Sequence, residues 1–289
     1  MIKKSTLLHL RIPFSFFLLP IFLFAMATAG FRMDYNSWLV FAILHLLLYP
    51  ASNGFNSYYD KDEKSIGGLQ NPPPVSRQLL IYSLLLDLMA ILLALSLDFG
   101  FALMIFGYGL VSKAYSHPSI RLKKYPVLGW LTIGIFQGLF TFLMVIKGLS
   151  EIDWRGLEDY FIPAILSTTL LLGSYPMTQV YQHQDDRQRG DLTISLKLGI
   201  LGTFHFTALF FTLSVGLFIF YFLNYYSLQM AILFPVLLSP TLFYFIFWYL
   251  KVRKQPAEAN YKNTMRLNFI SSLCLNIFFV ILIYSHSNA

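Results

Sequence analysis

Charged residues are scarce in this chain. They make up 12% of its 289 residues, about half of the roughly 25% that is usual in soluble proteins. Hydrophobic residues make up 56%, and many lie in long uninterrupted runs. A run of about 20 apolar residues is what a helix needs to cross the hydrocarbon layer of a membrane. This composition excludes a soluble fold and predicts a polytopic membrane protein.

Cysteine is almost absent. The single residue, Cys274, has no second cysteine with which to form a disulfide bond within the chain. A disulfide-stabilised extracellular scaffold is therefore excluded. Because Cys274 lies in an apolar run, we expect it to pack among hydrophobic side chains.

Nine long apolar runs predict nine transmembrane helices that form one all-α domain over residues 1–289. The first run also resembles a secretory signal, because Ala27-Thr28-Ala29 is similar to a cleavage site. Its apolar stretch of about 19 residues is long for a signal core, so we expect it to stay as a span. The predicted spans cover residues 12–30, 36–56, 79–97, 99–117, 126–147, 161–183, 200–223, 229–250 and 267–285.

Lysine and arginine indicate the orientation in the membrane, because short cytoplasmic loops carry an excess of them. With the N-terminus inside, 18 of the 21 basic residues lie on the inner side, and only Arg32, Lys147 and Arg155 lie outside. The odd number of spans then places the C-terminus outside. These loops also account for the net charge of +7, so nucleic-acid binding is not expected.

Carboxylates form two clusters in the loops predicted on the inner side. Acidic residues contribute little to membrane orientation, so these clusters need another explanation. The first cluster follows the second span and contains Asp60, Asp62 and Glu63. If the helix continues through it, Asn56, Asp60 and Glu63 stand at i, i+4 and i+7 and share one face.

The second cluster follows the sixth span and contains Asp185, Asp186 and Asp191. On a helix, Gln182, Asp185, Asp186 and Arg189 share a face. Oxygen ligands from two helix ends suit Mg²⁺, which keeps several waters and is completed by substrate phosphates. Either cluster alone is more simply interpreted as a solvated loop, but the two together on one side of the membrane predict a magnesium-diphosphate site.

Basic residues for a diphosphate lie in the loop after the fourth span. Lys113, Arg121 and Lys123 could hold phosphate oxygens by charge-assisted hydrogen bonds, although the positive-inside rule alone also accounts for them. His183 is not expected at a site of hard oxygen ligands. Asp87 lies within the third span, where we expect it to face the bundle interior or a polar partner.

These motifs resemble the UbiA superfamily of membrane prenyltransferases, and the resemblance covers nearly the whole chain. It implies nine helices around a central cavity, with the active site near the cytoplasmic face. The matching segments are Arg11-Ile12-Pro13 at the first helix, Asn56 to Asp60 in the first motif, Tyr115-Ser116-His117-Pro118 after the fourth span, and Asp185 to Thr193 in the second motif.

The resemblance implies a Mg²⁺-dependent transfer of a prenyl group from an allylic prenyl diphosphate to a lipophilic acceptor in the lipid membrane. The implied metal ligands are Asn56, Asp60, Glu63, Gln182, Asp185 and Asp186. The implied diphosphate ligands are Arg11, Lys113, Arg121, Lys123 and Arg187. The implied catalytic residues are Asp60, Asp186 and Tyr115, with Tyr58, Tyr59 and Tyr181 near the depth at which an aromatic ring could face an allylic cation.

Two positions depart from the family pattern. Lys64 stands where a further Asp is common, although Glu63 or Asp62 could take its place after a small turn, and Gln182 stands where an acid begins the second motif. These changes imply either a ligand set shifted towards Glu63 and Asp185 or a lower metal affinity. A transporter and a non-catalytic family member remain alternatives. We expect an aromatic or quinone-precursor acceptor, although a tetrapyrrole, a glycerol phosphate or a polyene also fits.

Overall fold

The fold is helical throughout, as the sequence predicts. The computed structural model describes residues 2–30 and 33–286, and in these ranges it contains no β-strand apart from one isolated bridge between Ile66 and Leu69. Arg32, one of the basic residues expected on the outer side, lies outside the described residues. The all-α class is confirmed.

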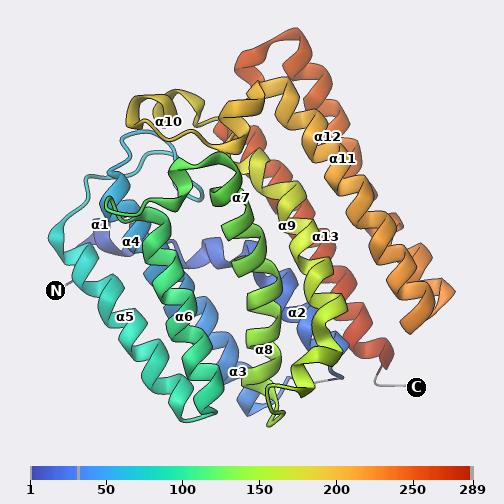
Figure 1. Cartoon of the computed structure of the whole chain (residues 1–289). Coiled ribbons are helices and arrows are strands. Elements are labelled where there is room, and N and C mark those ends of the chain that lie inside the picture. Colours follow the sequence, from blue (N-terminus) through green and yellow to red (C-terminus); the bar gives the residue numbers. More distant parts are fainter. Residues whose placement is uncertain (1, 31–32, 287–289) are drawn as a thin grey trace.

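Helices occupy each of the nine predicted ranges, and several ranges contain a series of shorter elements (Figure 1). In chain order the elements are α1 (Lys4–Leu10), η1 (Ile12–Phe17), α2 (Leu19–Thr28), α3 (Tyr35–Ala42), η2 (Ile43–Leu48), α4 (Tyr49–Asp60), α5 (Arg77–Leu95), α6 (Phe99–Ser116), η3 (Leu122–Lys124), α7 (Pro126–Gly134), η4 (Ile135–Phe140), α8 (Thr141–Leu149), η5 (Gly156–Tyr160), α9 (Phe161–Gln179), α10 (His183–Arg189), α11 (Ile194–Tyr225), α12 (Leu228–Lys254), η6 (Pro256–Glu258) and α13 (Tyr261–His286).

Seven helices in the described ranges are long and apolar enough to cross a membrane. The number rises to eight if the bent pair Lys4–Phe17 and Leu19–Thr28, which turns by 42°, forms one span. Helix α6 coincides with the predicted span 99–117 but is not among these helices. The polytopic class is therefore confirmed, whereas the count of nine crossings stays a prediction.

Two of the spans contain a π-helical turn. In the first, η2 lies just before Pro50, whose ring cannot donate a backbone hydrogen bond and crowds the carbonyl four residues earlier. In the second, η4, the backbone N–H of Leu139 donates to Oγ1 of Thr168 at 2.9 Å. The Thr168 side chain on α9 thus accepts a hydrogen bond from a backbone N–H that a regular α-helix would use within itself. Gly138 allows this approach, because a Cβ there would lie 2.6 Å from Cα of Thr168.

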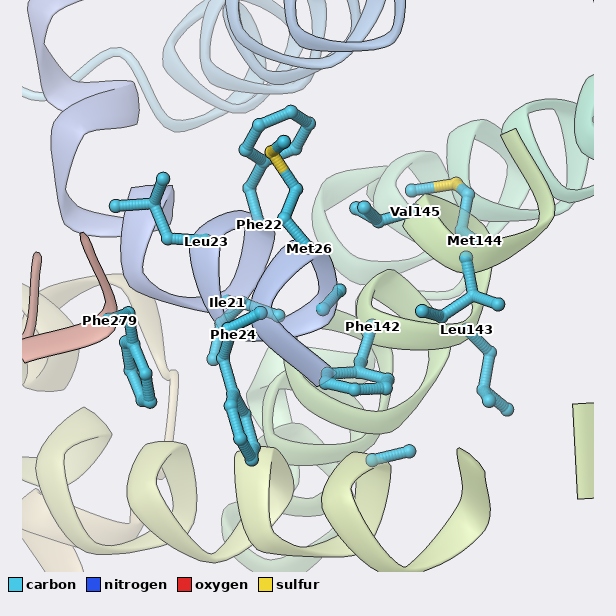
Figure 2. Packing of buried hydrophobic residues seen from close by; sticks show 14 of the residues in the cluster. Ile21, Phe22, Leu23, Phe24, Met26, Phe142, Leu143, Met144, Val145 and Phe279 are labelled. Atoms are coloured by element: carbon cyan, nitrogen blue, oxygen red, sulfur yellow. The ribbon is translucent and has the colours of Figure 1, made fainter. Parts of the chain in front are cut away.

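The largest hydrophobic core surrounds α2. Residues 20–27 of this helix are all buried, which is expected of a helix that is apolar on every side. Figure 2 shows Phe24 of α2 between Phe142 of α8 and Phe279 of α13. The ring centroids lie 5.3 and 4.7 Å apart, respectively. Together α2 and its neighbours form the largest cluster of buried hydrophobic residues in the described chain.

A buried ion pair joins α5 to α6. Lys113 donates to the carboxylate of Asp87 and, at 3.3 Å, to the carbonyl oxygen of Gly109. Its ammonium group also lies 5.4 Å from the ring centroid of Phe55. Asp87 therefore faces a partner inside the bundle, which confirms the expectation from the sequence that it would not face lipid.

This pair provides a test of the packing. Asp87→Leu leaves the Lys113 ammonium without a counter-ion, so we expect it to lower the stability of the detergent-solubilised protein by about 3–5 kcal/mol. The double variant Asp87→Leu with Lys113→Leu removes both charges and should recover most of that loss. Thermal unfolding of the two variants measures the difference; equal melting temperatures would contradict the assignment of a coupled pair.

Candidate active site

The two acidic clusters lie on one cavity of about 300 Å³. Helix α4 brings Asn56 and Asp60 to its wall, and it ends at Asp60 because Lys61 takes a left-handed conformation with φ of 50°. The helix therefore does not extend to Glu63. Asp62 lines the cavity from the loop, whereas Glu63 is exposed and does not line it.

The second cluster lies on and around the short helix α10. Asp186 is buried within α10, and Asp191 follows Gly190, whose φ of 72° ends the helix. Both carboxylates line the cavity, as does Gln182 just before α10. Asp185 lies elsewhere: it pairs with Lys64 at 3.0 Å and is not part of the cavity wall. The helical face expected for Gln182, Asp185 and Asp186 is thus only partly directed to the cavity.

Arg121 and Lys123 connect the loop after α6 to both acidic clusters. Arg121 binds Asp191 through two nitrogens, at 2.7 and 2.8 Å, and lies 3.4 Å from Asp60. Lys123 donates to the other oxygen of Asp60. The bidentate geometry on Asp191 is the arrangement in which a guanidinium holds a carboxylate most strongly. The hydrogen bond to Asp191 raises the pKa of Arg121.

Arg189 makes a second connection between the clusters. It donates to Asp62 of the first cluster and, at 2.8 Å, to Asp186 of the second. Its Nε lies 3.5 Å from Asp191. Through Arg189 and Arg121, the carboxylates of two segments more than 100 positions apart in the sequence form one continuous ion-pair network. The network closes the end of the cavity at which α4 ends and α10 begins.

Burial changes the acidity of two carboxylates in this network. It raises the pKa of Asp186 to about 6, against the opposing effects of Arg189 and of a 3.2 Å hydrogen bond from Thr193. Burial and the neighbouring Asp60 also raise the pKa of Asp62. Both groups would gain from an additional cation, because burial disfavours their charged forms.

Arg11 and Tyr115 occupy two further walls of the cavity. The guanidinium of Arg11 donates to the backbone carbonyls of Gly67 at 2.9 Å and Asn53 at 3.2 Å, and its buried Nε makes no hydrogen bond within the described chain. The hydroxyl of Tyr115 is hydrogen-bonded to the hydroxyl of Tyr175. Arg11 therefore has a free donor beside the cavity, and Tyr115 is held in place from α9.

The structure brings eight of the predicted site residues to the cavity and leaves the others apart. Lys113 pairs with Asp87, Arg121 contacts the cavity carboxylates without lining the cavity, and Arg187 is exposed on α10. Tyr58 and Tyr59 do not line the cavity. The predicted residues that line it are Arg11, Asn56, Asp60, Tyr115, Lys123, Tyr181, Gln182 and Asp186.

Sequence reasoning did not assign four side chains that the structure brings to the site. Asp62 was considered only as a substitute for the acid that Lys64 replaces, Asp191 was given no role, and Arg189 was placed only on a helical face. Tyr175 lies on α9, where no motif pointed to it. Gly190 was the available signal for Asp191, because a glycine after a polar helix indicates a turn that redirects the chain.

The oxygen donors of the site fit a loosely held divalent cation. In residues 2–30 and 33–286, no group of three His, Cys, Asp or Glu side chains could enclose a metal ion. Asn56, Asp60, Gln182 and Asp186 nevertheless present hard oxygen atoms to the same cavity. This arrangement fits Mg²⁺, which takes most of its ligands from water and phosphate and only one or two from carboxylates.

Comparisons with known proteins agree with this architecture. The sequence matches the model of the UbiA prenyltransferase family over residues 17–273. A comparison with curated protein sequences gave no match. Several solved structures share the fold at low sequence identity.

Three of these structures span nearly the whole chain. The UbiA homologue from Aeropyrum pernix K1 is 17% identical, with a TM-score of 0.72, and covers 93% of this chain and 98% of its own. A UbiA homologue from Archaeoglobus fulgidus bound to DMAPP and Mg²⁺ is 16% identical, with a TM-score of 0.65 and coverage of 97% and 99%. A structure of digeranylgeranylglyceryl phosphate synthase is 18% identical, with a TM-score of 0.61 and coverage of 99% of both chains. At these identities the likeness shows a common fold.

The ion-pair network makes a prediction for Arg189. Arg189→Gln removes the cation shared by Asp62 and Asp186, so we expect it to lower the stability of the metal-free protein by about 1–3 kcal/mol. Arg187→Gln, two positions away and exposed, is the matched control and should change stability by less than about 0.5 kcal/mol. Thermal unfolding in detergent measures both. Equal effects of the two changes would show that Arg189 does not hold the clusters together.

The raised pKa of Asp186 makes a second prediction. Because its folded-state pKa of about 6 exceeds the unfolded value near 4, the folded protein binds the extra proton between these values. Stability of the metal-free protein should therefore fall by about 1–3 kcal/mol as pH rises from 4 to 7, relative to Asp186→Asn. Unfolding of both proteins across this range, in the presence of a chelator, is the measurement; parallel pH profiles would contradict the shift.

Proposed function

Since the chain belongs to the UbiA prenyltransferase family, we propose that it transfers the prenyl group of an allylic prenyl diphosphate to a lipophilic acceptor within the membrane, with Mg²⁺ as cofactor. The observation that carries this proposal is the meeting of two acidic helix ends on one cavity. The related protein from Archaeoglobus fulgidus has been solved bound to DMAPP and to GPP, each with Mg²⁺. Its fold is the one found here.

Asn56, Asp60, Gln182 and Asp186 are the proposed metal ligands, because each offers an oxygen to the cavity. Bound Mg²⁺ would stabilise the negative charge that grows on the departing diphosphate. Glu63 and Asp185 are left out of the proposed set because neither lines the cavity. The Asp185–Lys64 pair instead joins the loop after α4 to α10.

Charge balance explains why a divalent cation is needed. Four carboxylates line the cavity, and the four cations that contact them or share the wall only balance their charge. A diphosphate would add net negative charge to a neutral site at the membrane edge, which is unfavourable without further cations. The carboxylates are Asp60, Asp62, Asp186 and Asp191, and the cations are Arg11, Arg121, Lys123 and Arg189.

Lys123 and Arg11 are the proposed diphosphate ligands, supported by Arg121 and Arg189. Lys123 and Arg189 bind Asp60 and Asp186, which are also proposed metal ligands, so with Mg²⁺ on these carboxylates their N–H groups would be available to phosphate oxygens. The bond between C1 of the prenyl chain and the diphosphate oxygen then breaks, and both electrons leave with the diphosphate. The acceptor donates an electron pair to C1 and loses a proton to the released diphosphate.

Tyr115 is proposed to face the allylic cation. Its ring lines the cavity, and the hydrogen bond to Tyr175 fixes its orientation. An aromatic ring face stabilises a nearby cation, more strongly where water is excluded. Gln179 in turn donates to the Tyr175 hydroxyl at 3.1 Å, so three side chains of α6 and α9 form one hydrogen-bonded unit.

The proposed topology places this site near the cytoplasmic face of an integral membrane protein. It rests on the 18 basic residues that fall on one side when the N-terminus is inside, which leaves the C-terminus outside. We further propose that the whole chain forms a single prenyltransferase domain. An aromatic or quinone-precursor ring is the proposed acceptor.

The metal assignment predicts two classes of variant. Asp60→Asn and Asp186→Asn should each lower Mg²⁺-dependent release of diphosphate by at least about 100-fold, because each removes a charge that holds the metal. Asp185→Asn and Glu63→Gln are matched controls from the same clusters and should retain activity within about threefold. The assay follows diphosphate release from short allylic donors by the purified protein. Full activity in both cavity variants would remove the proposal.

A further inference from the structure

The deep end of the cavity is polar, although it lies between the middles of long apolar helices. Tyr49 lies 11 residues before Asp60 on α4, or about 16 Å along the helix axis. Tyr108 lies seven residues before Tyr115 on α6, or about 10 Å along the axis. Gln137 lies near the middle of the span from α7 to α8. We call Tyr49, Tyr108 and Gln137 the cavity floor.

The floor residues are close enough to act on one ligand. The rings of Tyr49 and Tyr108 are 6.0 Å apart between centroids, and the Gln137 amide interacts with the Tyr108 hydroxyl. Ser52, one turn from Tyr49 on α4, also lines the cavity, and its buried hydroxyl has no hydrogen-bond partner in the part of the chain that the structure describes. A buried polar group without a partner is unfavourable, so this hydroxyl gains from a ligand that can bond to it.

The backbone is irregular where it presents these residues. Gln137 belongs to the π-helical turn η4, which the hydrogen bond from Leu139 to Thr168 maintains. The other π-helical turn, η2, ends directly before Tyr49. Such turns occur often at functional sites, because they redirect side chains that a regular helix would face elsewhere. Two independent spans are thus irregular at the same cavity floor.

The floor carries no formal charge. The basic residues that line the cavity are Arg11, Lys123 and Arg189, and all three lie with the acidic clusters at the opposite end. No charged side chain of the described ranges lines the cavity at the level of Tyr49, Tyr108 and Gln137. A carboxylate or phosphate placed there would lose its hydration without gaining a counter-ion.

We propose that the cavity floor is the acceptor subsite and that it takes an uncharged aromatic acceptor bearing a hydroxyl, carbonyl or amide group. The inference rests on the proposed function, in which the donor diphosphate occupies the end of the cavity at Asp60 and Asp186. Tyr115 and Tyr108 line the cavity about 10 Å apart along α6, which is enough length for a substituted ring with its nucleophilic atom towards the diphosphate. Gln137, Tyr108 and Ser52 hold the polar substituent at the other end.

Two ring compounds of the same shape test the charge preference. The detergent-solubilised protein, with Mg²⁺ and a non-hydrolysable thio-analogue of a short allylic diphosphate, is titrated with 4-hydroxybenzamide or 4-hydroxybenzoate by isothermal calorimetry. We expect the neutral amide to bind at least tenfold more tightly. Equal affinity, tighter binding of the carboxylate, or no binding of either compound would overturn the proposal.

Substitution of Gln137 tests the location. Gln137→Leu removes the hydrogen-bonding group and should weaken binding of the amide about 3- to 10-fold. Gln188→Leu, the same change at an exposed position of α10, should leave binding unchanged. Tyr108→Phe, which keeps the ring and removes the hydroxyl, is the second variant if Gln137→Leu unfolds. Unchanged affinity in a folded floor variant would refute this subsite.

Donor binding separates this inference from the proposed function. The increase in melting temperature caused by Mg²⁺ with the donor analogue should be the same in wild type, Gln137→Leu and Tyr108→Phe, because none of these changes touches the acidic clusters. If wild type shows no such increase, the proposed function fails. If the increase is present but the charge preference is absent, only the acceptor subsite fails.

Discussion

The structure depends on the ion pairs that Arg121 and Arg189 make with carboxylates from two distant segments. Asp60 and Asp62 follow the second predicted span, whereas Asp186 and Asp191 follow the sixth, and the two arginines join them into one network. Without these cations, four acids around a partly buried cavity would repel one another. In the proposed function, a divalent cation would replace part of these arginine contacts.

The fold combines a closely packed hydrophobic part around α2 with a part at the cavity where the helices are interrupted. Around α2, closely packed aromatic rings fill the bundle, and this part resembles the interior of any helical protein. At the cavity, by contrast, the helices are interrupted: α1 ends just before Arg11, α4 ends just before Lys61, and α9 is followed by the separate helix α10. Backbone without regular hydrogen bonds is tolerated at membrane depth only inside protein or along a cavity. The interruptions therefore gather where polar ligands can reach the chain.

Much of this was predictable from the sequence, for identifiable reasons. The length of the apolar runs indicated the helical class, and the two acidic clusters indicated the end of the bundle at which the cavity lies. Individual side-chain contacts were harder to predict, because they depend on the residue at which a helix ends. Glu63 was expected on the face of Asn56 and Asp60, but the left-handed Lys61 ends α4 before it. Likewise Asp185 stands beside Asp186 in the sequence, yet α10 directs it to Lys64. The floor residues carry no motif at all, since only the fold brings Gln137 beside Tyr108.

The contact between Leu139 and Thr168 has a geometric consequence for the fifth predicted span. A π-helical turn accommodates one residue more than an α-helical turn, so it rotates everything that follows by about 100° about the helix axis. Thr168 on α9 therefore helps to set which face of α8 is directed to the core. With this rotation, Phe142 packs against Phe24. The hydroxyl group of Thr168 thus links two helices: a residue of α9 affects the rotation of α8 about its own axis.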